Sequence, residues 1–138
     1  MTPVPHLIAD YDRARHEAFV LASWEGRWPG RPPKRDRNVM ADLLRSPGVR
    51  CVVAHHPESP DDLYGWAAVE AGVVLWSYVR ALHQLRRHGL GTSLLVALGV
   101  DPAAKTPCRY WSPLGAAWAA RPGVSLYYAP EGHERNAA

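Results

Sequence analysis

The chain has 138 residues, enough for one domain with a hydrophobic core, and 47% of them are apolar, which argues against a disordered chain. Its formal net charge of +3 is too small for a dedicated nucleic-acid-binding protein. The two cysteines, Cys51 and Cys108, lie in apolar runs, so the sequence predicts neither a metal site nor a disulfide framework. No segment has the pattern of a signal peptide or a membrane span, and we expect a cytoplasmic monomer or homodimer.

The first quarter of the chain is predicted to contain one strand and one helix. The strand covers Val4 to Ile8, and Asp10 is expected to cap a helix that runs to about Glu25. Residues three or four apart predict the buried face of this helix. These residues are Tyr11, Ala14, Ala18, Leu21 and Ala22.

A loop and a second helix follow. The loop, Trp28 to Arg37, is rich in proline and basic residues, and Asn38 is expected to cap a helix that Ser46-Pro47-Gly48 ends. We interpret the basic residues from Arg27 to Arg37 as a solvated surface. A phosphate-bearing ligand or a nucleic acid remains an alternative partner for them.

The middle of the chain is predicted to form three strands and a helix. The strands are Val49 to His55, Leu63 to Glu70 and Val73 to Val79. His56 to Asp62 is expected to be a turn, and Ala71-Gly72 a tight hairpin. A leucine-rich helix from Leu90 to Leu98 is expected to bury one face. That face holds Leu90, Leu94, Leu95 and Leu98.

The last third of the chain is predicted to add two strands and a helix. The expected segments are a connector at Asp101 to Pro107, a strand at Cys108 to Trp111, a helix at Pro113 to Arg121, a strand at Val124 to Ala129 and a frayed tail over 130–138. The order β-α-α-β-β-β-α-β-α-β predicts one α/β domain over residues 1–138, with a mixed sheet of about six strands and about four helices.

The stretch from Gln84 to Thr92, QLRRHGLGT, predicts an anion site, because it joins a strand to the start of a helix. The first turn of a helix leaves N–H groups without partners, and Gly89 and Gly91 allow a phosphate to approach the backbone. Arg86 and Arg87 add positive charge. The alternative is a basic turn whose glycines only end a strand and begin a helix.

The spacing Arg86-x-x-Gly89-x-Gly91 resembles the pyrophosphate loop of GNAT-type N-acetyltransferases, and the element order is that of the GNAT fold. The resemblance implies a central sheet that splays between two strands, and acetyl-CoA as the cofactor. The chain is also similar to short GNAT-like proteins encoded by phages. That similarity rests on Ser23-Trp24, Tyr64-Gly65-Trp66 and Tyr78-Val79.

The resemblance assigns cofactor contacts to two segments. The backbone of Ser77, Tyr78 and Val79 would pair with the pantetheine arm, although Tyr78 and Val79 also fit an ordinary sheet core. The diphosphate would lie on the segment Arg86, Arg87, His88, Gly89, Leu90, Gly91 and Thr92. Val79 to Gly89 is about two residues longer than the usual spacing, which leaves the individual N–H donors open.

The resemblance also implies an acid and a base. Glu70 is the nearest equivalent of the family's base, with a solvated surface carboxylate as the alternative, and His83 is a phosphate neighbour or a surface histidine. The family's tyrosine acid is replaced by Trp118 and Ala119, so we choose Tyr128, which also fits a packed aromatic residue.

The predicted function is acetyl-CoA-dependent acyl transfer to an amine on an unidentified acceptor, by direct attack. The alternatives are a catalytically inactive GNAT-fold binding protein with a phage or host-interaction role, and an acyltransferase that modifies nucleobases.

Overall fold

A computed structural model describes residues 5–25, 34–80, 90–108 and 124–128. These residues form six strands and three helices. The elements in chain order are β1 (Leu7–Asp10), α1 (Arg13–Glu25), α2 (Lys34–Arg45), β2 (Val49–His56), β3 (Ser59–Glu70), β4 (Val73–Val79), α3 (Leu90–Ala97), β5 (Thr106–Cys108) and β6 (Leu126–Tyr128). Within the described residues, no helix is both long and apolar enough to cross a membrane.

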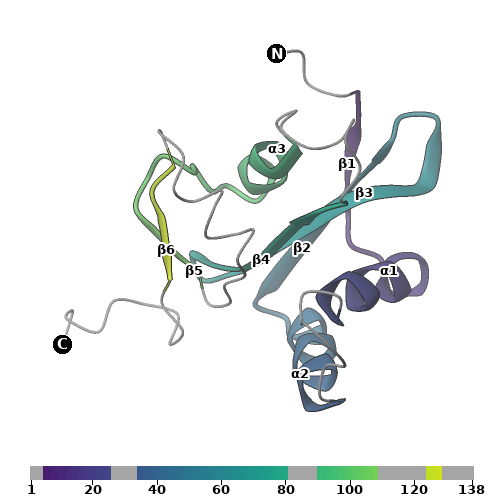
Figure 1. Ribbon diagram of the computed structural model, residues 1–138, viewed down its shortest axis with the longest axis horizontal. Helices are drawn as coiled ribbons and strands as arrows, with labels where there is room; N and C mark the ends of the chain where they lie inside the picture. The colour runs from purple at the N-terminus through teal and green to yellow at the C-terminus, as the bar shows by residue number, and fades with distance from the viewer. Residues whose placement is uncertain (1–4, 26–33, 81–89, 109–123, 129–138) are drawn as a thin grey trace.

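The six strands form one sheet in the order β1-β2-β3-β4-β5-β6. The pairs β1–β2, β2–β3 and β3–β4 are antiparallel, and the pairs β4–β5 and β5–β6 are parallel. Helices cover both faces, with α1 and α2 on one side and α3 on the other (Figure 1). The prediction of a mixed sheet of about six strands is confirmed. Three of the four predicted helices are described, and the fourth, Pro113 to Arg121, lies outside the described residues.

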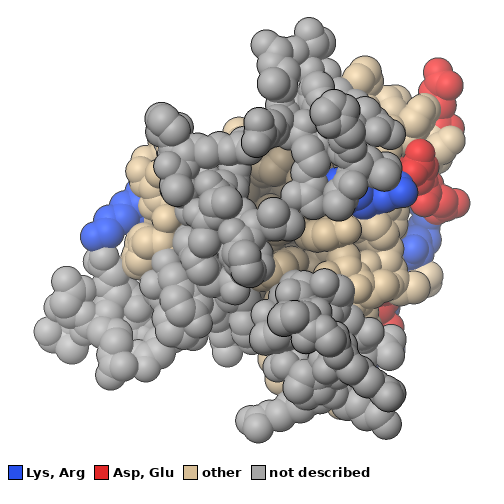
Figure 2. Space-filling view, viewed as in Figure 1, with Lys and Arg blue, Asp and Glu red and all other residues tan. Residues whose placement is uncertain are grey.

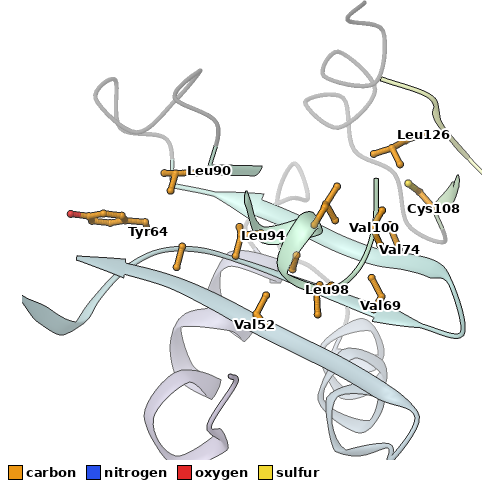
Figure 3. Close-up of a cluster of buried hydrophobic side chains, with 13 residues drawn as sticks. Val52, Tyr64, Val69, Val74, Leu90, Leu94, Leu98, Val100, Cys108 and Leu126 are labelled. Carbon is orange, nitrogen blue, oxygen red and sulfur yellow. The ribbon is translucent and has the colours of Figure 1, made fainter. Parts of the chain in front are cut away.

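The sheet separates two hydrophobic cores. On the side that we call the α3 face, Leu90, Leu94 and Leu95 are at most 2% exposed, and each stabilises the fold by about 2 kcal/mol through burial. Leu98 is also buried, so the predicted face of this helix is confirmed (Figure 3). The opposite side, the α1 face, is built around Trp24 and Trp66, which are at most 1% exposed.

Three register shifts interrupt the pairing of the central strands, and two of them insert a single residue. In β3, Gly65 is opposite Ala54 and Leu63 is opposite His55, so Tyr64 is an extra residue. In β4, Trp76 is opposite Ala68 and Val74 is opposite Val69, so Leu75 is an extra residue. Each extra residue exchanges the faces to which the following side chains point.

The β3–β4 hairpin closes where the sequence predicts it. Glu70 pairs with Val73 across Ala71 and Gly72, whose φ angles are 50° and 81°. Two central residues with positive φ match the twist of a two-residue hairpin. Gly72 adopts this conformation without strain, whereas the Cβ of Ala71 makes it unfavourable there.

The start and buried face of α1 differ from the prediction. Asp10 pairs with Val52 at the end of β1, and Asp12 caps the helix instead, because its Oδ1 accepts the N–H of Ala14 at 3.1 Å. Ala14, Ala18 and Ala22 are exposed. The helix instead turns larger side chains toward the sheet, because they bury more apolar area than alanine does. The buried residues are His16, Val20, Leu21 and Trp24.

Several boundaries also differ from the prediction. Helix α2 begins at Lys34, inside the predicted loop, so Asn38 is a helix residue and not its cap. Strand β3 begins at Ser59, within the predicted turn, because Ser59 pairs with His56 and the backbone bonds of a hairpin need no apolar side chains. Strand β5 covers Thr106–Cys108, which overlaps the predicted connector. Residues 109–111 and the tail at 130–138 lie outside the described residues.

Candidate functional site

The end of β4 presents its side chains to both faces of the sheet. Tyr78 packs against the α1-face core, where its ring meets Phe19 of α1 edge-on with 6.1 Å between centroids. Val79 packs against the α3-face core, and alternation places Ser77 on the same side. All three predicted residues, Ser77, Tyr78 and Val79, are half-buried.

Strand β4 pairs with β5 in parallel at Val74 and Cys108, the only Cα partners of the two strands among the described residues. The positions that would lie opposite Leu75 to Val79 on that side begin at residue 109, outside the described residues. On its other side β4 pairs with β3, where Trp66 is opposite Tyr78. The splay between two central strands therefore stays a prediction.

The first turn of α3 lies on the α3 face, on the side of the sheet to which Val79 points. The helix begins at Leu90, as the sequence predicts, and Leu90 belongs to the core cluster that Val79 contacts. Gly91 is half-buried and Thr92 is exposed. The other members of the predicted phosphate segment, Arg86, Arg87, His88 and Gly89, lie outside the described residues.

No family model and no curated protein sequence matches the chain. Several solved structures do match. The aminoglycoside N-acetyltransferase AAC(6')-Iy in complex with CoA superimposes with a TM-score of 0.56 at 15% identity, over 83% of this chain and 82% of that one. A putative acetyl transferase from Pyrococcus furiosus gives a TM-score of 0.50 at 13% identity, over 96% and 87%.

A third match is the GCN5-related glucosamine N-acetyltransferase region of a fungal multi-domain GH3 β-N-acetylglucosaminidase. Its TM-score is 0.54 at 21% identity, over 70% of this chain and 12% of the fungal chain. The chain has the GNAT fold. At these identities the likeness establishes the architecture and leaves the chemistry to the residues of this chain.

The two predicted catalytic residues lie away from the end of β4. Glu70 pairs with Val73 at the start of that strand, about 20 Å along the strand from Val79 for six residues at 3.3 Å each. Its carboxylate is half-buried and lies near Gly48. Tyr128 pairs through its backbone with Cys108, so it lies two strands from β4. His83 lies outside the described residues.

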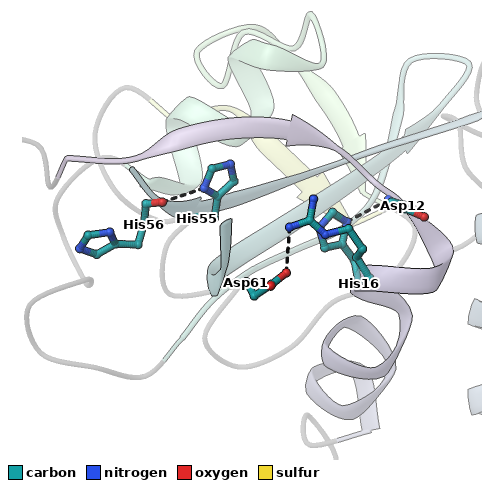
Figure 4. A network of polar contacts seen from close by, with 6 residues as sticks. Asp12, His16, His55, His56 and Asp61 are labelled. Carbon is teal, nitrogen blue, oxygen red and sulfur yellow. Dashed lines mark hydrogen bonds and ion pairs between the residues drawn. The ribbon is translucent and has the colours of Figure 1, made fainter. Parts of the chain in front are cut away.

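A polar network on the α1 face joins α1 to the β2–β3 hairpin (Figure 4). The backbone N–H of Asp12 donates to Nδ1 of His16 at 2.9 Å, and Nη2 of Arg15 donates to Oδ1 of Asp61 at 2.8 Å. Burial, followed by the charge of Arg15, lowers the pKa of His16. His16 is therefore a neutral hydrogen-bond acceptor near pH 7, with its proton on Nε2.

The same hairpin is acidic and touches the end of β4. Its exposed carboxylates are Glu58, Asp61 and Asp62, and Figure 2 shows acidic side chains gathered at that end of the molecule. Nη1 of Arg80, the residue after β4, donates to Oδ1 of Asp62 and to the carbonyl oxygen of Leu63, both at 3.2 Å. Among the described residues, no group of three histidine, cysteine or acidic side chains is arranged to hold a metal ion.

Gly65 is a candidate site residue that the sequence analysis did not single out as functional. It lies on β3 opposite Val79, at the end of β4. The signal for it was a glycine inside an otherwise apolar strand, which indicates a bulge or a close backbone approach.

Proposed function

We propose that this protein is an acetyl-CoA-dependent N-acyltransferase, which transfers the acyl group to an amine by direct attack. The observation that carries the proposal is that Val79 at the end of β4 and Leu90 at the start of α3 line the same core on one face. Backbone groups at the end of a strand suit the amides of a pantetheine arm, and the amino end of a helix suits a diphosphate.

Direct transfer is favoured over a covalent acyl-enzyme by the state of the nearest thiol. Cys108, which pairs with Val74 of β4, is 5% exposed, and burial raises its pKa to about 12. A thiol with that pKa stays protonated near pH 7 and is a poor nucleophile. The amine of the acceptor therefore attacks the thioester carbonyl itself, and the CoA thiolate leaves.

The acid and the base of the reaction remain proposals. The amine must lose a proton and the departing thiolate must gain one. Glu70, about 20 Å along β4 from Val79, is our candidate base. Tyr128, two strands away, is our candidate acid. The acceptor class is open and includes modified nucleobases.

Three short motifs support kinship with phage-encoded GNAT-like proteins, because all three meet at this site. The indole Nε1 of Trp66 donates to Oγ of Ser23 at 2.7 Å, Trp66 pairs with Tyr78, and Gly65 pairs with Val79. We propose this kinship together with a cytoplasmic location. A GNAT-fold protein that binds the cofactor or a partner without catalysis is the alternative.

Acetyl-CoA binding tests the proposal. At a concentration about 100 times its Kd, the ligand stabilises the folded state by about 2.7 kcal/mol, which raises Tm by roughly 8–13 °C for a domain of this size. The double variant Arg86→Glu with Gly89→Trp should abolish the shift, whereas Arg50→Glu, an exposed charge reversal on β2, should retain it. No shift for the wild type at millimolar acetyl-CoA refutes the proposal.

A turnover assay distinguishes an active acyltransferase from the catalytically inactive binding protein. Release of free CoA in the presence of a panel of amines, followed with a thiol reagent, should exceed the rate without amine. A clear Tm shift without amine-dependent release would support the binding protein.

A further inference from the structure

The first turn of α1 is closed by two hydrogen bonds between Asp12 and His16. The backbone N–H of His16 donates to the carbonyl oxygen of Asp12 at 2.8 Å, and the backbone N–H of Asp12 donates to Nδ1 of the His16 ring at 2.9 Å (Figure 4). Oδ1 of Asp12 also accepts the N–H of Ala14 at 3.1 Å. This arrangement resembles a capping box, in which a side chain of the first turn accepts the N–H of the capping residue.

The acceptor of this box is a histidine, whereas glutamate or glutamine is usual. The amide oxygen of a glutamine accepts a hydrogen bond at every pH, but Nδ1 of a histidine accepts one only while the imidazole is neutral. An imidazolium carries a hydrogen on both ring nitrogens, so Nδ1 of a charged His16 would present a donor to the N–H donor of Asp12. The box can therefore close only on a neutral ring.

The surroundings of His16 oppose its charged form. The side chain is 4% exposed, and burial, followed by the charge of Arg15, lowers its pKa. The start of a helix is the positive end of its dipole, and the first turn of α1 holds no acidic residue. Three further groups act on the ring, since the carboxylates of Asp12 and of Asp61 on β3 favour its charge and His55 on β2 disfavours it. The neutral form is favoured overall.

We propose that Asp12 and His16 form a pH-sensitive switch at the start of α1, closed while the imidazole is neutral and open when it takes up a proton. Arg15 lies in the same turn, and its Nη2 donates to Oδ1 of Asp61 on β3 at 2.8 Å. Opening of the turn therefore loosens a contact between α1 and the β2–β3 hairpin. The switch is independent of the proposed acyl transfer, because none of these residues belongs to the predicted cofactor or catalytic set.

An NMR titration of the folded protein from about pH 7.5 to 4.5 tests the switch. At the start, the ¹⁵N signals of the His16 ring should show a neutral imidazole with its proton on Nε2, because Nδ1 accepts the Asp12 N–H. As the ring becomes charged, the Asp12 amide proton should move to lower chemical shift with the same midpoint, and the amides of Leu94 and Leu95 in α3 should not follow it. A proton on Nδ1 at the start, a ring that stays neutral until the protein unfolds, or an Asp12 signal that does not move overturns the proposal.

Two variants separate the loss of this acceptor from a general effect of acid. His16→Gln supplies an acceptor that does not titrate, so the Asp12 signal should stay in place over the same range. His56→Gln is the matched control, because Nδ1 of His56 also accepts a backbone N–H, that of Glu58 at 3.0 Å, but at an exposed position. It should leave the Asp12 titration as in the wild type. If the Asp12 signal of His16→Gln moves as far as in the wild type, another group drives the change and the proposal is wrong. If His16→Gln does not fold, the wild-type titration decides.

Discussion

Removing the hydroxyl of Ser23 should destabilise the protein far more than the loss of a single oxygen atom suggests. Its Oγ accepts the indole N–H of Trp66 at 2.7 Å and donates to the carbonyl oxygen of Val20 at 2.8 Å. Trp66 is fully buried. Ser23→Ala leaves the indole N–H in the core without this acceptor, which costs about 1–3 kcal/mol. We expect Tm to fall by roughly 4–12 °C.

Ser46→Ala is the matched control, because the Ser46 hydroxyl also donates to a backbone carbonyl, that of Asp42 at 3.2 Å, but on the exposed surface. It should change stability by less than about 0.5 kcal/mol. Trp66→Phe removes the buried donor, so a cycle of Ser23→Ala with Trp66→Phe should show a coupling of about 1 kcal/mol in urea unfolding. Equal losses for the two serine variants, or additive effects in the cycle, would contradict this reasoning.

Three further predictions concern stability. The pKa of His16 lies below its usual 6.5, so the unfolded state binds the proton first as pH falls. The free energy of unfolding should therefore decrease as pH drops below about 6.5. Urea unfolding from about pH 5 to 8 should show this slope, and His16→Asn should flatten it. Leu94→Ala should lower the free energy of unfolding by about 3–5 kcal/mol. Val96→Ala, at a residue that is 59% exposed, should lower it by less than about 1 kcal/mol. Similar losses for the two variants would contradict the assigned buried face of α3. Ala71→Gly should raise stability by about 0.5–1 kcal/mol by relieving the positive φ, and a lower Tm would show that the turn is not strained.

The sequence was most informative where several local signals agreed. Strand β4 has the predicted limits, because a β-branched run follows a turn glycine. Helix α3 begins at the predicted residue, and its leucines form the predicted buried face. In the predicted stripe of α1, Leu21 is buried as expected, but the three alanines are exposed, because alanine fits a buried or an exposed helix position equally well. The larger residues two positions after them, His16, Val20 and Trp24, are buried instead.

The polar first residues of β3 show a second limit of prediction from the sequence. Ser59 to Asp62 is rich in residues that favour turns, yet it belongs to the strand, whose first residue Ser59 pairs with His56 of β2 beyond the edge of the core. Such an extension depends on a partner strand and leaves no hydrophobic periodicity in the sequence. The predicted phosphate segment before Leu90 stays a prediction, since Arg86 to Gly89 lie outside the described residues.

The bulge at Leu75 decides which groups the end of β4 offers to each face. Strict alternation from Val74, which packs on the α3 face, would place Tyr78 on that face and Val79 on the other. The extra residue reverses this, so Tyr78 joins the aromatic side chains beside α1 and Val79 lies under α3. A bulge is set by pairing with the neighbouring strand, and the run from Val73 to Val79 holds no glycine that would mark it. One inserted residue therefore decides that Tyr78 meets the aromatic residues of the α1 face and that Val79 meets the core beneath α3.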